Sequence, residues 1–282
     1  MGYGCNAAGV TGARIINSPR ERLLAILTNV FTPCNGRFPL YITLSTVFLG
    51  GFFAGGGPSA AKLAALLGVM GIVLLGIAVT FLVNWALSKT LLKGETSFFA
   101  MELPPYRKPQ IVKTLIHSLV ERTMKVLQRA VVVAIPAGVV IWLMANIPAD
   151  GVSLLLQAGT FLDPFARLMG LDGVILLAFI LAFPANEIVL PIIIMSYMST
   201  SAMLELSDLT QLHALLTQNG WTLITAVNVM LFSLMHFPCG TTLLTIKRET
   251  KSAKWTAIAF ALPTLLGIAA TMTVTALWRL FT

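Results

Sequence analysis

The stretch Phe183-Pro-Ala-Asn-Glu-Ile-Val-Leu-Pro191 decides the fold. It lies in Val174–Met198, an otherwise apolar run in which Glu187 is the only charged residue. Burying a carboxylate at bilayer depth costs several kcal/mol unless a proton, a cation or a hydrogen-bond donor compensates it. Pro184 and Pro191 each remove a backbone donor, so we expect the run to break into half-helices around Glu187. Broken apolar segments that carry a charge are typical of a transporter's binding site. The alternative is a carboxylate that pairs with a lysine or arginine and locks helices together.

The composition indicates a membrane protein. Hydrophobic residues make up 57% of the 282-residue chain and charged residues 11%, which excludes a soluble globular domain. The net charge is +8, and the basic residues that cause it lie beside apolar spans. Membrane topology therefore explains the charge better than nucleic-acid binding does. Three cysteines do not predict a disulfide framework.

The predicted fold is all-α and polytopic. We expect about five to six transmembrane helices, a re-entrant broken-helix hairpin and an interfacial amphipathic helix. The expected helix start at Ser18-Pro19 precedes the spans, the interfacial helix covers Ile111–Arg129, and 148–172 is expected to be a linker with an apolar centre. The division into domains is expected at residue 129, with a membrane region at 1–129 and a C-terminal gate-type domain at 130–282. The expected spans are 40–53, 63–92, 130–147 with a kink at Pro136, the broken run 174–198, 221–246 and 255–277.

Lysine and arginine counts predict the orientation. Basic residues gather before Phe38, between Lys89 and Arg129, and in Lys247–Lys254, so these segments and the N-terminus should face the cytoplasm, with Arg279 outside. Both flanks of Val174–Met198 are poor in basic residues, which favours a re-entrant hairpin over a crossing. A partial crossing within Leu154–Phe165 is the alternative.

Two Pro-Cys pairs, Pro33-Cys34 and Pro238-Cys239, lie at the edges of apolar runs. Each proline frees a carbonyl on the preceding turn, and each cysteine offers a thiolate or thiol to a passing cation. Together with Cys5, a carboxylate and amide oxygens, these ligands suit ferrous iron or another first-row divalent ion. The alternative for a buried cysteine is a small hydrophobic residue.

Two further residues are candidate metal ligands. Asn186 can offer an amide oxygen or cap a half-helix. His236 can be a ligand or hydrogen-bonded structure. The sequence contains no P-loop and no nucleophile and base at usable spacing, so we expect a transporter portion rather than an enzyme.

Five motifs, in order, resemble the membrane half of the FeoB family of prokaryotic ferrous iron transporters. They are Gly2-Tyr-Gly-Cys-Asn6, Thr32-Pro-Cys-Asn-Gly-Arg-Phe-Pro39, Glu102-Leu-Pro-Pro-Tyr-Arg107, Asn186-Glu-Ile-Val189 and Phe237-Pro-Cys-Gly-Thr241, with Arg248-Glu249 downstream. The resemblance implies uptake of Fe²⁺ as transported substrate across a bacterial or archaeal plasma (inner) membrane, with no tightly bound cofactor. By motif, Cys5, Cys34, Cys239 and Glu187 match the family's cysteine and acidic positions.

The resemblance also implies a partner. In the family the pore is coupled to an N-terminal GTPase, so GTP should act only through a missing or separate GTPase domain, and homo-oligomers are possible. Ala7-Ala-Gly9 and Asn35-Gly-Arg-Phe-Pro39 depart slightly from the family pattern. The chain is expected to be one half of a split transporter, a truncated product or a chain read from an internal methionine. The alternatives are a nucleoside or organic-solute carrier of the gate-domain type and a non-transporting fragment.

Overall fold

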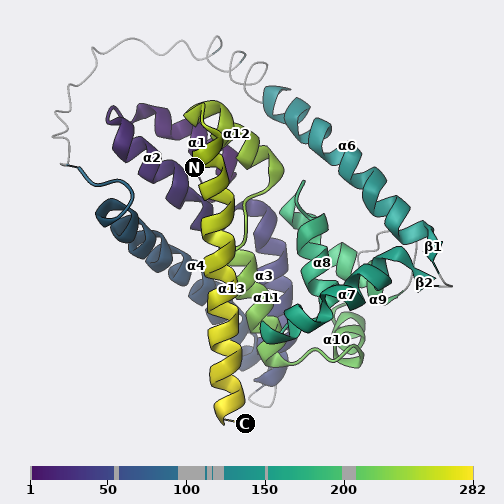
Figure 1. Cartoon of the computed structure of the whole chain (residues 1–282). Coiled ribbons are helices and arrows are strands. Elements are labelled where there is room, and N and C mark those ends of the chain that lie inside the picture. The colour runs from purple at the N-terminus through teal and green to yellow at the C-terminus, as the bar shows by residue number, and fades with distance from the viewer. Residues whose placement is uncertain are drawn as a thin grey trace.

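The computed structural model describes residues 2–53, 57–94, 124–149, 152–198 and 208–281, together with residues 112 and 116. The fold in these ranges is helical, as predicted, apart from a two-stranded hairpin of β1 (Pro148–Ala149) and β2 (Val152–Ser153) (Figure 1). Glu102-Leu-Pro-Pro-Tyr-Arg107 lies outside the described residues, and so does most of the predicted interfacial helix.

Short helices form the N-terminal part of the chain. Ser18 caps α2 as predicted, because its hydroxyl accepts a hydrogen bond from the Glu21 backbone N–H at 3.4 Å. The chain then breaks at Pro33-Cys34 and continues into a helical segment over the predicted span 40–53. The elements are α1 (Asn6–Gly12), η1 (Ala13–Ile15), α2 (Pro19–Thr28), η2 (Asn29–Phe31), η3 (Asn35–Arg37), α3 (Phe38–Leu44) and the π-helical η4 (Ser45–Gly50).

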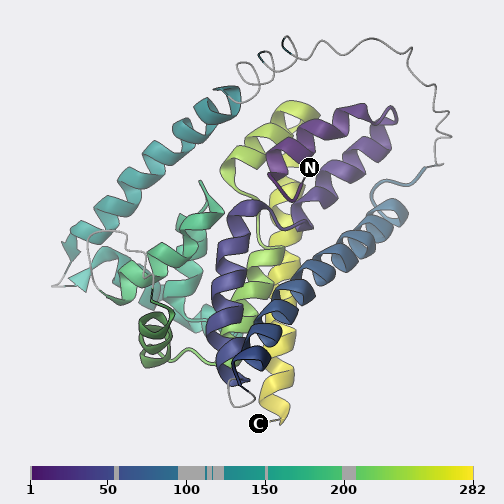
Figure 2. The same cartoon turned by 180° about the vertical axis from the view of Figure 1, so that it is seen from behind.

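Long apolar helices surround this part. Within the described ranges, three helical segments are long and apolar enough to cross a membrane. A fourth crossing results if α7 (Leu154–Leu168) and α8 (Gly173–Leu181), bent by 108° against each other, form one span. The bounds of the other long or neighbouring helices are α4 (Pro58–Lys89), α6 (Met124–Asn146), α11 (Leu223–Met235), α12 (Gly240–Thr250) and α13 (Ala253–Phe281). In the two opposite views, α3, α11 and α13 run side by side, and α6 stands away from them (Figures 1 and 2).

The central run breaks once rather than twice. It folds into α8 (Gly173–Leu181), η7 (Asn186–Ile188) and α9 (Val189–Tyr197), and α8 packs against α9 as expected for a hairpin. The break lies at Pro184, as predicted. The prediction of a second break at Pro191 is wrong: this proline lies in the first turn of α9, where a backbone N–H has no helical partner to lose.

The expected linker at 148–172 is also corrected. Most of it is α7 (Leu154–Leu168), capped by the Ser153 hydroxyl, so the alternative of a partial crossing there describes it better. A hydrogen-bond chain holds the following turn: Tyr197 donates to the Asp172 carboxylate, and the Trp221 indole donates to Tyr197 Oη at 2.8 Å. Another short helix, α10 (Leu209–Gln218), precedes α11.

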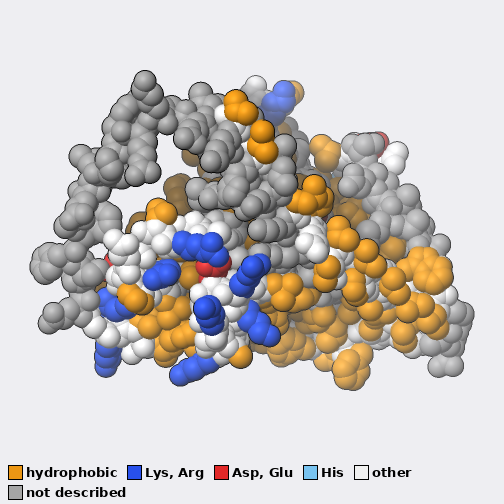
Figure 3. Space-filling model, turned by 90° about the horizontal axis from the view of Figure 1, so that it is seen from above, with side chains coloured by type: hydrophobic (Ala, Val, Ile, Leu, Met, Phe, Trp, Pro, Cys, Tyr) orange, Lys and Arg blue, Asp and Glu red, His pale blue; other side chains and the backbone are white. Residues whose placement is uncertain are grey.

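Basic side chains gather at one end of the molecule. The face seen from above, which carries the N-terminal helices and α12, shows clustered Lys and Arg side chains beside a broad apolar region (Figure 3). The C-terminus lies at the opposite end (Figure 1). The N-terminus and the turn after α12 therefore lie on one side of the molecule, in agreement with the prediction that the N-terminus and Lys247–Lys254 face the same side of the membrane. Arg14 and Glu249 join η1 to α12 there, with an N–O distance of 2.6 Å.

Candidate functional site

Four interruptions of helical structure converge in the interior. The Asn35 N–H, just after Cys34, donates to the Gly4 carbonyl at 3.4 Å, and the Gly240 N–H donates to the Phe183 carbonyl at 2.7 Å. A Cβ atom placed on Gly36 would lie 3.6 Å from Glu187 Oε2. These two hydrogen bonds and this close approach join the break at Cys34 to the segment before Cys5, the break at Cys239 to the Phe183 break, and the Cys34 break to Glu187. Segments more than 150 residues apart in the sequence therefore meet at one place.

Each cysteine occupies the same local position. Cys5, Cys34 and Cys239 directly precede α1, η3 and α12, and none uses its side chain to cap the helix that follows. The N-terminal end of a helix carries positive partial charge, which stabilises a thiolate once a metal ion displaces its proton. The three thiols are therefore presented at helix starts rather than committed to the backbone.

None of the three cysteines is in a disulfide. All three are free and half-buried, and the Cys239 thiol interacts electrostatically with Cys5 and Cys34. Cys239 Sγ is 3.2 Å from Thr242 Oγ1, on the first turn of α12. Sulfur ligands from three parts of the chain thus face a shared region.

Asn6 fixes the first of these segments. In the amide orientation that satisfies both of its ends, its nitrogen donates to the carbonyls of Gly2 and Thr32, each at 3.1 Å. The Asn29 amide in turn donates to the Asn6 carbonyl at 2.9 Å. Asn6 thus joins the Cys5 and Cys34 segments through hydrogen bonds to backbone carbonyls.

Glu187 lies at the surface of the chain. Its side chain is exposed, and it forms no ion pair with any residue that the structure describes. Its position at bilayer depth stays a prediction, and the alternative of a helix-locking ion pair finds no support in the described ranges. Asn186, next to it, is buried, and within the described structure its Oδ1 has no hydrogen-bond partner. A carboxylate and an amide oxygen are thus both available at this break.

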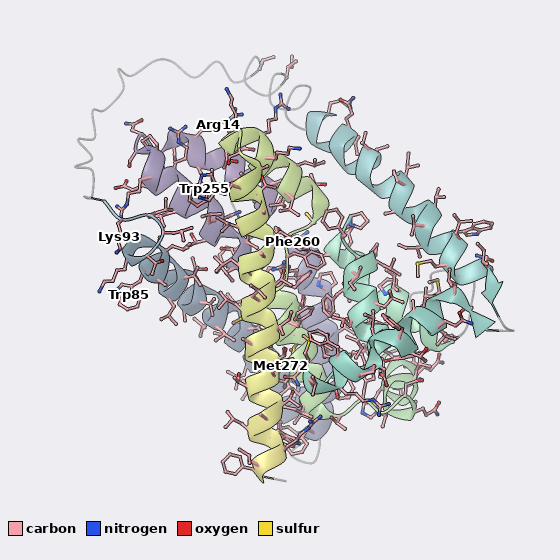
Figure 4. All side chains as sticks on the ribbon, in the orientation of Figure 1. Arg14, Trp85, Lys93, Trp255, Phe260 and Met272 are labelled. Carbon is pink, nitrogen blue, oxygen red and sulfur yellow. The ribbon has the colours of Figure 1, made fainter. Side chains whose placement is uncertain are left out.

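His236 lies behind the third break. It is fully buried among Phe179, Phe232 and Phe237, with ring centroids 5.0 to 5.8 Å away. Its Nδ1 lies 2.9 Å from the Ser233 carbonyl, so Nδ1 carries the proton and Nε2 has a lone pair. Phe260 of α13 stacks on Phe237 at 4.9 Å and covers the break from outside (Figure 4). The hypothesis that His236 is a metal ligand stays a prediction, and the histidine sits farther into the apolar core than the thiols.

The site is not a closed metal-binding cage. Among the residues described, no three His, Cys, Asp or Glu side chains are close enough to hold one ion together. The arrangement offers one or two protein ligands at a time along a line of helix starts. Such a line can pass an ion on without trapping it.

Arg37 is the feature that sequence reasoning missed. It counts among the basic residues that predict the cytoplasmic side, yet it is 0% exposed and lies three residues after Cys34. Its Nη1 donates to the backbone carbonyls of Leu234 at 3.0 Å and Val30 at 3.4 Å. Its position between Pro33 and Pro39, next to Cys34, is the sequence feature that could have indicated its burial.

Comparisons with known proteins agree with this geometry. Residues 69–120 match the family described as "Ferrous iron transport protein B C terminus", and residues 127–253 match "Nucleoside recognition" (Gate). The Fe(2+) transporter FeoB of Staphylococcus aureus strain COL is 33% identical over 273 residues, which is 93% of this chain and 37% of the relative.

Two spirochaete proteins are more distant. The Fe(2+) transporter FeoB of Leptospira interrogans strain Fiocruz L1-130 is 26% identical across 98% of this chain and 42% of its own length. The Leptospira biflexa FeoB is 26% identical across 94% and 40%. The chain thus spans about two fifths of the length of these relatives, and no solved structure matches it. The ordered motifs, the two domain matches and these relatives show that the chain belongs to the FeoB family and corresponds to its C-terminal membrane portion.

Proposed function

We propose that this chain is the membrane permease portion of a ferrous iron uptake system. The observation that supports the proposal is the convergence of three reduced cysteines at helix starts with the exposed carboxylate of Glu187. The relatives are named Fe(2+) transporters, and this supports ferrous iron as the transported ion. We place Cys5, Cys34, Cys239 and Glu187 on the ion's path, with Asn186 as an oxygen donor and His236 as the innermost candidate.

The chemistry of these ligands fits a transported divalent ion. Thiolates and imidazole favour first-row transition metals over Mg²⁺ and Ca²⁺, which prefer oxygen ligands. Conduction requires binding that is favourable enough for entry and weak enough for release. Successive one- or two-ligand contacts meet both needs, since each replaces part of the hydration shell and none completes a cage.

A partner is part of the proposal. The chain covers about two fifths of its relatives, so we propose that transport depends on further FeoB sequence that carries the GTPase, either covalently joined or as a separate chain. GTP hydrolysis would then bias the packing of the half-helices from outside this chain. We place the assembly in the plasma (inner) membrane, with the basic end in the cytoplasm.

Uptake of radiolabelled ferrous iron tests the partner requirement. We expect cells that lack their own ferrous transporters to accumulate iron when they express this chain beside a GTPase-bearing FeoB front half, and to stay near background with either part alone. The control is the same pair with the GTPase's nucleotide-binding lysine replaced by alanine. Full uptake by this chain alone would contradict the partner requirement, and background uptake by the intact, inserted pair would contradict the function.

A second candidate rests on the description of the Gate match, "Nucleoside recognition". A nucleoside carrier would show uptake of radiolabelled nucleoside that thiol reagents leave unchanged. The position of all three cysteines at helix starts favours iron, because a nucleoside pocket has no need of them.

A further inference from the structure

The C-terminal end of α11 must satisfy its carbonyls before the chain breaks at Pro238-Cys239. The last four carbonyls of a helix have no partner within the helix, and a buried carbonyl without a donor is costly. The Phe232 carbonyl accepts from the His236 N–H at 2.8 Å, and the Ser233 carbonyl accepts from His236 Nδ1 at 2.9 Å. Both of these donors belong to the break itself.

The Leu234 carbonyl needs a donor from elsewhere. In a continuing helix it would accept from the residue four positions later, which is Pro238, and proline has no N–H. Arg37 Nη1 supplies the missing donor at 3.0 Å, across 197 residues of sequence. A side chain from the Cys34 segment therefore completes the helix that ends just before Cys239.

Arg37 is a buried cation whose hydrogen-bond partners are backbone carbonyls. No described residue forms an ion pair with it, and its Nε and Nη2 atoms have no hydrogen-bond partner in the described structure, so its burial is costly. The C-terminal end of α11 carries negative partial charge, and the Leu234 and Val30 carbonyls both accept from Nη1. The guanidinium thus compensates the end of one helix while its own chain segment carries Cys34.

We propose that Arg37 is a positioning residue that clamps the two Pro-Cys breaks together and so fixes the Cys34 and Cys239 thiols relative to each other. Its consequence for iron transport rests on the proposed function, but the clamp itself does not. Without the guanidinium, the Leu234 carbonyl would be buried without a donor, and the end of α11 would open more often. Both thiols would then become more accessible.

The test measures how fast iodoacetamide alkylates each cysteine of the full-length chain in detergent without metal. Mass spectrometry reads out the labelled fraction of each cysteine over time. We expect Arg37→Gln to speed labelling of Cys34 and Cys239 by about tenfold or more. This is the change in the opening equilibrium that follows from losing a buried hydrogen bond to a charged group. Arg37→Lys should keep most of the protection, because the lysine ammonium can still donate to the Leu234 carbonyl.

The matched control is Arg20→Gln. Arg20 Nε also donates to a backbone carbonyl near a helix end, that of Leu92 at 2.5 Å, but beside α4 rather than at the breaks. It should leave both labelling rates at the wild-type value. Unchanged labelling in Arg37→Gln, or equally fast labelling in Arg37→Lys and Arg37→Gln, would overturn the proposal. If Arg37→Gln fails to accumulate, the yields of the two variants are compared instead: a higher yield of Arg37→Lys supports the clamp, and an equal loss of yield contradicts it.

Iron uptake by the same variants separates the two proposals. Faster labelling with loss of uptake supports both the clamp and the metal path. Faster labelling with normal uptake would keep the clamp and contradict the assignment of Cys34 and Cys239 to the path.

Discussion

Cys239→Ser is expected to reduce ferrous iron uptake to background, measured in cells that express this chain with a GTPase-bearing front half. Serine fits the helix start of α12 as well as cysteine does, so the fold should persist. The hydroxyl, however, does not replace a thiolate as a ligand for a first-row divalent ion. Because no described group of three ligands holds the ion at once, each ligand on the path carries a large share of the transfer.

Glu187→Gln is the companion variant of this prediction. The change is isosteric at an exposed side chain, so it should leave the amount of inserted protein unchanged while removing the negative charge that attracts the cation. The matched control is Glu249→Gln, which removes a carboxylate from the Arg14 pair, away from the breaks. That control should retain uptake, since the pair lies away from the breaks and its Arg14 side chain is 60% exposed, and surface ion pairs are worth only about 0–1 kcal/mol. Normal uptake in both Cys239→Ser and Glu187→Gln would contradict the assigned site.

Gly173→Ala is expected to prevent the chain from accumulating as folded protein. A Cβ atom on Gly173 would lie 1.8 Å from the Gly159 carbonyl oxygen and 2.8 Å from the Asp163 nitrogen. Both contacts are with backbone, so α7 and α8 would have to move apart at their 108° bend. Overpacking of this kind costs about 1–3 kcal/mol or more, and here no flexible side chain can yield.

The measurement is the fraction of monodisperse protein in detergent and its thermal unfolding midpoint. Gly71→Ala on α4 is the matched control, because its Cβ meets no atom within 4 Å. It should behave like the wild type. Equal yield and midpoint for the two alanine variants would contradict the close crossing of α7 and α8.

The sequence predicts the breaks better than it predicts what surrounds them. Pro184 and Pro238 lie in apolar runs, and a proline inside a helix removes a donor wherever it occurs, so local chemistry is enough to place both breaks. Ser18-Pro19 marks the start of α2 for a similar local reason. Pro191 shows the limit: the same residue is harmless in a first turn, and which turn it occupies depends on where the previous helix ends.

Burial depends on tertiary contacts and was harder to predict. Glu187 lies in an apolar run, yet its side chain is exposed at the surface of the chain. Arg37 lies among basic residues, yet it is buried because a carbonyl freed 197 residues later needs a donor. The linker predicted at 148–172 is mostly helix α7, in which Asp163 and Arg167 pair with each other one turn apart.

The spacing of Cys5, Cys34 and Cys239 in the sequence does not predict which breaks lie together. Backbone hydrogen bonds join the Cys34 segment to the Cys5 segment, from Asn35 to Gly4, and the Cys239 segment to the Phe183 break, from Gly240 to Phe183. The proposed division at residue 129 stays a prediction. Its two sides pack closely, since α1 lies against α12.

X-ray absorption at the iron edge tests the central claim most directly, with the purified full chain loaded with Fe²⁺ under anaerobic conditions. The account predicts sulfur scattering at about 2.3 Å, the length of a metal–thiolate bond. That signal should disappear in a variant with serine at Cys5, Cys34 and Cys239. An iron shell made only of oxygen and nitrogen, identical in the wild type and the serine variant, would contradict the account.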